Sequence, residues 1–102
     1  MSTNKDYLNS LLDQLSSLEG ITYRMMMGEY VIYFRGKVAA YVCDNRLLIK
    51  PVPAAINMLP YAEYDSISQG GRKKLLRIDN VDDRDFLTDL FNAIYDALPF
   101  SK

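Results

Sequence analysis

The stretch that decides the fold runs from Ile21 to Lys50 and reads ITYRMMMGEYVIYFRGKVAAYVCDNRLLIK. Aromatic and β-branched residues dominate it, with interruptions at Gly28, at Arg35-Gly36 and at Asp44-Asn45. Residues of the first kind favour strands, whereas glycine, asparagine and aspartate favour the turns between strands. The pattern therefore predicts an antiparallel meander of four strands, at residues 22–27, 29–34, 38–43 and 46–50.

The two central strands of this meander carry apolar side chains on both faces. Successive side chains of a strand point to opposite faces of the sheet. The rule separates Tyr30, Ile32 and Phe34 from Val31 and Tyr33 in the second strand, and Val38, Ala40 and Val42 from Ala39, Tyr41 and Cys43 in the third. We expect helices to cover one face, and a further helix or a second copy of the protein to cover the other.

The segment before the meander predicts an amphipathic helix. Its leucines recur at spacings of three and four, which is the stripe of a helix with one buried face. Thr3 is the expected cap and Gly20 the expected left-handed stop, so that the helix covers about residues 4–18.

The segment after the meander predicts two more helices and a fifth strand. We expect a short helix at about 53–59, a strand at 73–78, and a last helix that begins near Asp82 or Asn80 and ends before Pro99. The whole is predicted to be one domain of residues 1–102. Its fold class is α+β, with an antiparallel β-meander sheet packed in two layers with N- and C-terminal helices.

Composition excludes several classes of function. The chain of 102 residues has 12 Lys and Arg against 13 Asp and Glu, no histidine and one cysteine. The balanced charge gives no general attraction to nucleic acid or anionic membrane, and the missing histidine removes the usual general base and metal ligand. With no secretory signal, no membrane-length apolar segment and no disulfide pair, a cytoplasmic protein is expected.

No group of residues predicts catalysis, a metal or a cofactor. Cys43 precedes Asp44, whose charge would raise the thiol pKa, so an inert and partly buried thiol is the better interpretation. Glu29, after Gly28, is interpreted as a solvent-facing turn acid. The acids of residues 79–85 lack the spacing of a calcium loop and fit a capped helix start. Met25 to Met27 are interpreted as core filling and an apolar sheet face.

One basic cluster provides a nucleic-acid alternative. It consists of Arg72, Lys73, Lys74 and Arg77, and it could contact phosphates together with Arg24 and Lys50 if all six lay on one face. An edge strand that charge protects against unwanted pairing explains the cluster equally well.

The meander also resembles the N-terminal domain of TfoX (Sxy) type competence regulators. The residues that match the family pattern are Arg24, Met26, Gly28, Tyr30, Tyr33, Gly36, Leu47 and Lys50. Met27 stands where the family has phenylalanine, and Glu29 and Val31 stand where it has glycines. The flanking helices follow in the family's order, so the resemblance covers nearly the whole chain, without the C-terminal helical domain of the longer regulators.

The resemblance implies a fold like that of secretion-chaperone-type domains, which often dimerise, and no established catalytic activity. We therefore expect a non-enzymatic regulatory or protein-interaction domain that acts in competence or transcription regulation. It is expected to form a homodimer and to bind a protein partner of unknown identity. The alternatives are the nucleic-acid-binding module described above and a small-molecule-binding domain. The latter would need a pocket lined by Tyr30, Tyr33 and Met27.

Overall fold

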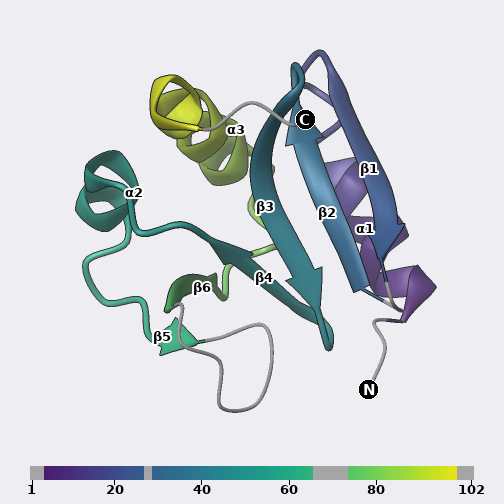
Figure 1. Ribbon diagram of the computed structural model, residues 1–102, viewed down its shortest axis with the longest axis horizontal. Coiled ribbons are helices and arrows are strands. Elements are labelled where there is room, and N and C mark those ends of the chain that lie inside the picture. The colour runs from purple at the N-terminus through teal and green to yellow at the C-terminus, as the bar shows by residue number, and fades with distance from the viewer. Residues whose placement is uncertain (1–3, 27–28, 66–73, 99–102) are drawn as a thin grey trace.

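The computed structural model describes residues 4–26, 29–65 and 74–98, which form a six-stranded antiparallel sheet with helices packed against it (Figure 1). The sheet order is β1-β2-β3-β4-β6-β5. The strands are β1 (Ile21–Met26), β2 (Glu29–Phe34), β3 (Lys37–Cys43), β4 (Arg46–Ile49), β5 (Tyr64–Asp65) and β6 (Leu75–Ile78). The helices are α1 (Lys5–Gln14), α2 (Pro53–Met58) and α3 (Arg84–Ile94), and a 3₁₀ turn, Tyr95–Ala97, continues α3. The predicted two-layer α+β fold is confirmed.

The four meander strands lie where the sequence predicts them, because their turns are encoded locally. The β2–β3 turn consists of Arg35 and Gly36, with φ of 53° and 81°. The β3–β4 turn consists of Asp44 and Asn45, with φ of 52° and 58°. Two successive residues with positive φ make the hairpin turn whose twist matches that of the strands it joins. These two turns fix the register of β2, β3 and β4.

The strand predicted at 73–78 is β6, but it does not lie at the edge of the sheet. It pairs with β4 on one side and with the two-residue strand β5 on the other. The interpretation of the basic cluster as protection of an edge strand is therefore wrong. Residues 66–73, which include Arg72 and Lys73 of that cluster, lie outside the described residues.

One face of the sheet packs on all three helices, and α1 is seen behind β1 and β2 in Figure 1. Buried residues of α1 and α3, among them Leu8, Leu11 and Phe91, join Ile32 and Phe34 of β2 in one core. The ring centroids of Phe34 and Phe91 are 6.3 Å apart. Burial of such side chains, at roughly 25 cal/mol per Å² of apolar surface, is the main force that holds the two layers together.

A β-bulge changes the alternation predicted for β3. The register with β2 runs from Ile32 opposite Ala40 to Tyr33 opposite Val38, so that Ala39 is the extra residue. Paired residues share a face in an antiparallel sheet. Val38 therefore lies on the face of Tyr33, and not with Ala40 and Val42 as predicted. Ala39 is only 3% exposed and joins the core on the helix side.

The first helix is shorter than predicted at its C-terminal end. Asn4 caps it, with its side-chain oxygen accepting a hydrogen bond from the backbone N–H of Asp6 at 2.7 Å, while the predicted cap Thr3 lies outside the described residues. The helix ends at Gln14, and Gly20, with φ of 80°, does not stop it but begins the approach to β1. The last helix begins close to the predicted position, but its cap is Asp83 and not Asp82 or Asn80.

Candidate functional site

The face of the sheet opposite the helices, called the open face below, is covered by no helix among the described residues. Cys43, Leu48 and Leu75 form a small apolar cluster there, and Tyr41 packs against it. Leu48 is 0% exposed and Val31 9%, although both belong to this face. The apolar centre predicted for the second face is therefore present.

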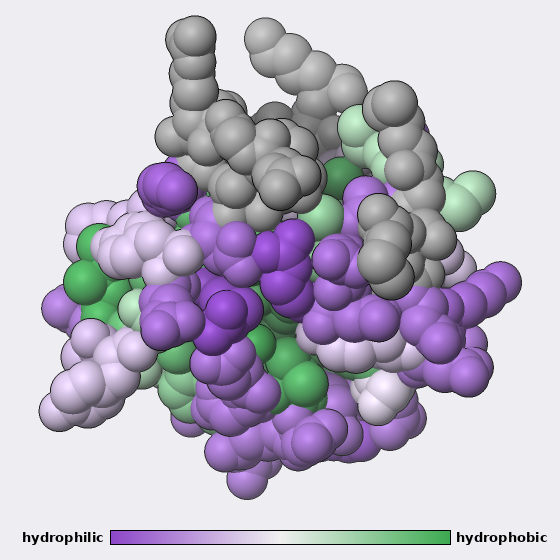
Figure 2. All heavy atoms as spheres, turned by 90° about the horizontal axis from the view of Figure 1, so that it is seen from below, coloured by the Kyte–Doolittle hydropathy of each residue, from purple (hydrophilic) through white to green (hydrophobic). Residues whose placement is uncertain are grey.

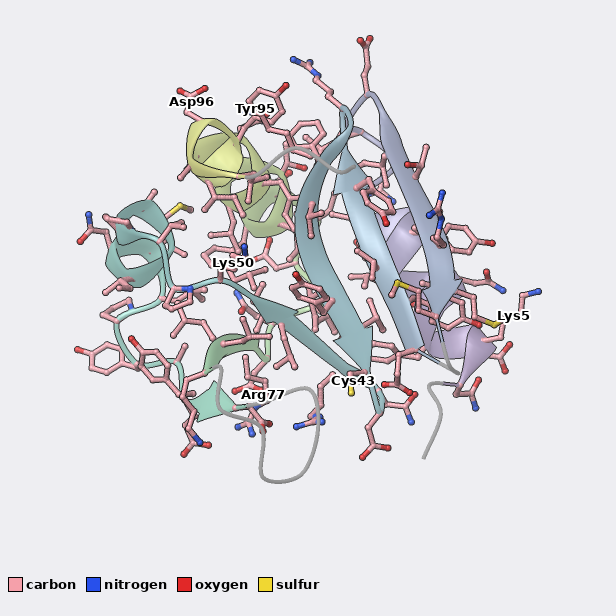
Figure 3. All side chains as sticks on the ribbon, in the orientation of Figure 1. Lys5, Cys43, Lys50, Arg77, Tyr95 and Asp96 are labelled. Atoms are coloured by element: carbon pink, nitrogen blue, oxygen red, sulfur yellow. The ribbon has the colours of Figure 1, made fainter. Side chains whose placement is uncertain are left out.

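At one end of the open face, charged side chains link neighbouring strands. Glu29 of β2 accepts a hydrogen bond from the backbone N–H of Asp44 at 2.9 Å, so it braces a turn, as a solvent-facing turn acid can. Arg46 forms an ion pair with Asp65, which connects β4 to β5. Cys43 and Arg77 are both found toward this end of the sheet (Figure 3). Seen from there, the described surface is mostly hydrophilic (Figure 2).

Cys43 lies among these charged side chains and is poorly suited to nucleophilic chemistry. Its Sγ is 3.7 Å from Nη2 of Arg46, and its carbonyl oxygen accepts a hydrogen bond from Nε of the same residue at 3.2 Å. Burial, followed by the hydrogen bond and the charge of Glu29, raises the pKa of the Cys43 thiol to about 11, and Arg46 opposes the rise without cancelling it. The reactive form is the thiolate. The thiol is therefore protonated near neutral pH. The sequence predicted a raised pKa from the charge of Asp44, whereas burial and Glu29 raise it in the structure.

Arg77, which the sequence suggested as a phosphate contact, is surrounded by carboxylates. Its Nε donates to Asp79 at 2.9 Å, its Nη2 donates to Glu63 at 2.9 Å, and its Nη1 is 3.9 Å from Asp65. The hydrogen bond with Asp79 is the largest cause of the raised pKa of Arg77. A guanidinium neutralised in this way offers little attraction to a phosphate. Its side chain instead connects β6 to β5 and to the loop that follows β6.

The structure brings together only part of the proposed basic surface. Lys50 and Lys74 line one open pocket of about 390 Å³ with Leu75. Arg24 lies on β1, whereas Lys50 follows β4. These strands are three spacings apart in the sheet, which is roughly 14 Å at about 4.8 Å per spacing. Of the described basic residues proposed for nucleic-acid binding, Lys50 and Lys74 are the two that the structure places in one pocket.

The residues that match the family pattern do not converge on one point. Arg24 and Tyr33 belong to the open face, Tyr30 and Leu47 are buried on the helix side, Gly36 forms a turn, and Met26 is 52% exposed at the end of β1. Gly28 lies outside the described residues. Most of these residues build the meander itself.

The small-molecule pocket expected from the sequence does not form as proposed. Tyr30 and Tyr33 lie on opposite faces of β2, because Tyr30 pairs with Val42 on the helix side and Tyr33 with Val38 on the open side. Met27, the third proposed lining residue, is outside the described residues. That set of residues cannot line one cavity.

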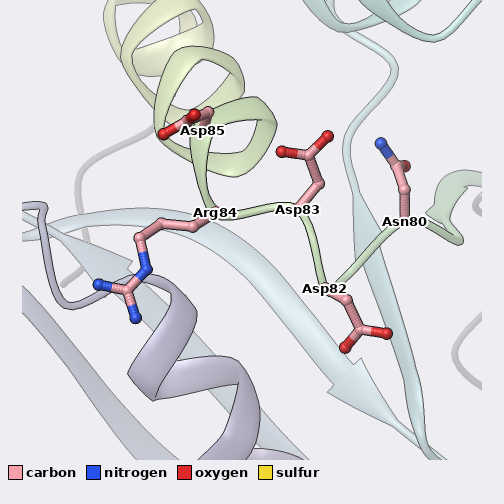
Figure 4. Close-up of a pocket in the computed structure, with 5 residues that line it drawn as sticks. All are labelled: Asn80, Asp82, Asp83, Arg84 and Asp85. Carbon is pink, nitrogen blue, oxygen red and sulfur yellow. The ribbon is translucent and has the colours of Figure 1, made fainter.

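A pocket at the start of α3 is lined by acids, but these do not point to one ion (Figure 4). Oδ1 of Asp83 accepts a hydrogen bond from the backbone N–H of Phe86 at 3.0 Å and so caps the helix. Arg84 reaches instead toward α1, where its guanidinium is 3.4 Å from Asp13. No three acids, cysteines or histidines within residues 4–26, 29–65 and 74–98 are placed to hold a metal.

The most exposed apolar side chains near the meander lie on β1, a feature that sequence reasoning missed. Met25 is 64% exposed, Met26 52% and Tyr23 45%. The interpretation of the methionines as core filling is wrong for Met25 and Met26, because β1 is the edge of the sheet and has a neighbour on one side only. In the sequence, the signal for an edge open to a partner is the run of consecutive apolar residues in β1, whose side chains must point to both faces of the sheet.

None of the described helices is long and apolar enough to cross a membrane. The sequence of this chain matches the family model of the TfoX N-terminal domain over residues 13–92, from the end of α1 through most of α3. The chain is also 29% identical to a protein of Spirochaeta aurantia described as an uncharacterized 12.7 kDa protein in the trpE 5′ region, over 100% of this chain and 89% of that protein. The chain therefore belongs to the TfoX N-terminal domain family.

Proposed function

We propose that this chain is a non-enzymatic regulatory domain that acts in the cytoplasm through protein contacts and functions as a homodimer. Family membership supports a regulatory role of the kind associated with competence genes. The observation that carries the proposal is the exposure of apolar side chains along the edge strand β1, with Tyr23 and Met25 on the helix side and Met26 on the open face. Exposed apolar patches on small proteins typically mark protein contacts.

The chemistry of the described residues supports a role without catalysis. The Cys43 thiol has a raised pKa, and the carboxylates of Asp65, Glu63 and Glu29 are engaged by Arg46, by Arg77 and by a backbone N–H, respectively. Nucleophilic catalysis needs an activated thiolate or hydroxyl, and acid–base catalysis needs a titrating group directed at an accessible cavity. The groups of the open face are used to connect strands.

The association can be tested by sedimentation velocity from micromolar to millimolar concentration. We expect a dimer, and we expect Met25→Glu to weaken it at least tenfold, because a charge would replace an apolar contact; tenfold is about 1.4 kcal/mol. Ile56→Glu is the matched control, since Ile56 is 42% exposed on α2, away from β1, and its replacement should leave the dimer intact. A wild-type protein that stays monomeric throughout would refute the homodimer.

The regulatory role needs a separate measurement. Deletion of the gene in its host should change the levels of specific transcripts, and expression of the wild-type protein should restore them. The Met25→Glu variant, expressed to the same level, should fail to restore them if the contacts of β1 carry the function. Unchanged transcripts after deletion would argue against a role in transcription.

Nucleic-acid binding is a competing function supported by one observation, the shared pocket of Lys50 and Lys74. A labelled duplex mixed with the protein at low salt tests it directly, because phosphate contacts weaken steeply as salt is added. Salt-sensitive binding that Lys50→Gln reduces would favour this function over the one proposed.

A further inference from the structure

The edge strand β1 lacks the features that usually protect an exposed strand. It is six residues long, pairs with β2 without a register shift, and contains no proline. Arg24 is its one charged residue. Natural sheets block such edges with charges, prolines, bulges or very short strands, because an unprotected edge pairs with other chains. The opposite edge is protected in this way, since β5 has only two residues.

The outward backbone groups of β1 can be identified from its pairing with β2. The N–H of Arg35 donates to the carbonyl of Gly20 at 2.9 Å, so Gly20 directs its carbonyl toward β2. Inward and outward groups alternate along an antiparallel pair. Thr22, Arg24 and Met26 therefore bond to β2, whereas Ile21, Tyr23 and Met25 direct their N–H and C=O groups away from the sheet.

We propose that β1 pairs antiparallel with β1 of a second copy, around a two-fold axis that is perpendicular to the sheet and passes midway between the Tyr23 residues of the two copies. The pairing extends the two sheets into one and keeps both helix layers on the same side. It rests on the homodimer of the proposed function, and it specifies the surface and the register of that dimer.

The register follows from the outward groups and from charge. With Tyr23 opposite Tyr23 of the partner subunit, Ile21 of each copy lies opposite Met25 of the other, and all three outward residues are used. A register centred on Arg24 would place two arginines directly opposite each other, which is destabilising. Centred on Tyr23, each Arg24 instead lies opposite a threonine, Thr22.

The side chains of this register are complementary as well. Ile21, Tyr23 and Met25 all lie on the helix side, because they pair with Phe34, Ile32 and Tyr30 of β2. Tyr23 already packs edge-on against Tyr30, with ring centroids 5.8 Å apart. The dimer would therefore continue the apolar row of the helix side across the axis and cover the exposed parts of Tyr23 and Met25. Aromatic and β-branched pairs across strands each contribute roughly 0.2–1 kcal/mol.

A proline substitution separates dimer formation from folding. The N–H of Tyr23 points outward, so Tyr23→Pro removes two hydrogen bonds of the symmetric dimer, one from each copy, but none of the β1–β2 ladder, and edge strands tolerate proline. We expect the dissociation constant of the dimer to rise at least a hundredfold, with the circular dichroism spectrum of the monomer unchanged. Tyr23→Phe is the matched control and should dimerise like the wild type.

Disulfide trapping tests the register, in a Cys43→Ala background. Tyr23→Cys should cross-link under mild oxidation, because directly opposed residues that exchange hydrogen bonds have Cα atoms about 5.5 Å apart, within the range of a disulfide. Arg24→Cys should not, because the two copies would be diagonal neighbours about 7–8 Å apart.

The outcomes distinguish this inference from the proposed function. A wild-type dimer that Tyr23→Pro leaves intact overturns the pairing through β1 but not the homodimer, whereas a wild-type monomer overturns both. Cross-linking at position 24 in place of position 23 overturns the register. Loss of the dimer in Tyr23→Pro together with cross-linking at position 23 supports the inference.

Discussion

Lys37 offers a test of how β3 is attached to the last helix. Its side chain is buried, 9% exposed, and its Nζ donates to the carbonyl oxygen of Tyr95 at 3.1 Å. The same Nζ lies 4.2 Å from the centre of the Tyr95 ring. Tyr95 begins the 3₁₀ turn that continues α3, so the ammonium is placed at the carbonyl end of that helix, where a positive charge is favoured.

Lys37→Met keeps the length of the side chain and removes its charge and donor. A hydrogen bond from a charged donor contributes about 1.5–3 kcal/mol, and a cation over an aromatic ring about 0.5–2 kcal/mol. The desolvation of a buried ammonium offsets part of this sum. We expect a net loss of about 2 kcal/mol in the free energy of unfolding, which for a domain of this size lowers Tm by roughly 8–16 °C.

Urea unfolding followed by circular dichroism measures this loss, and Lys5→Met is the matched control. Lys5 is exposed in the first turn of α1, so its replacement should change stability by no more than about 0.5 kcal/mol. A Lys37→Met variant as stable as that control would refute the reasoning. In a Tyr95→Leu background, which lacks the ring, the cost of Lys37→Met should be smaller.

Three further predictions concern turns, pH and charge. Gly20→Ala should cost more stability than Gly36→Ala in thermal unfolding: both glycines have positive φ, but an added Cβ at Gly20 would lie 2.9 Å from Cγ of Arg35, whereas at Gly36 it meets nothing within 4 Å. The raised pKa of Cys43 means that the unfolded thiol ionises first. Stability should therefore fall between about pH 9 and pH 11, by at most about 2–3 kcal/mol, and a Cys43→Ala variant should show a shallower fall in urea unfolding across that range. Asp65→Asn should remove about 1 kcal/mol at low salt, because it weakens the pairing with Arg46, and the loss should shrink in high salt; an equal loss at both salt concentrations would count against an ionic origin.

The parts of the fold that sequence predicted well are those that depend on neighbouring residues. The turns at Arg35-Gly36 and Asp44-Asn45 need positive φ, and Gly36, Asp44 and Asn45 are of the residue types that accept it most readily. The start of α3 is local as well, although the residue that caps it is Asp83 and not Asp82 or Asn80: Asp83 bonds to a backbone N–H three residues later. Such features need no knowledge of what packs against them.

The parts that were missed depend on contacts between distant segments. The leucine stripe continues past Gln14, but Ser16 and Ser17 lie beside α3, where the hydroxyl of Ser17 is 2.9 Å from that of Thr88. Serine is a poor residue for a helix interior, because its hydroxyl forms hydrogen bonds with nearby backbone groups in other conformations. The leucine pattern alone could not show that contacts with α3 accompany the end of the helix.

The site was harder to predict than the fold because it depends on strand order. Arg77 meets Glu63 and Asp65 only because β5 lies beside β6, and no local pattern predicts that pairing. Likewise, Met25 is exposed because β1 is an edge strand, although its sequence would suit a central strand. The same residue types would have been buried with a neighbour on each side.

The two-residue length of β5 has a consequence for the size of any assembly. A sheet that is open at both edges can add copies without end and grow into a fibre, whereas a symmetric contact through one edge closes on itself. Here one edge offers six residues and the other two. After pairing through β1, each copy has only the two-residue edge β5 left exposed, so association through the sheet would stop at two chains. Raising the concentration would increase the fraction of dimer without starting a polymer.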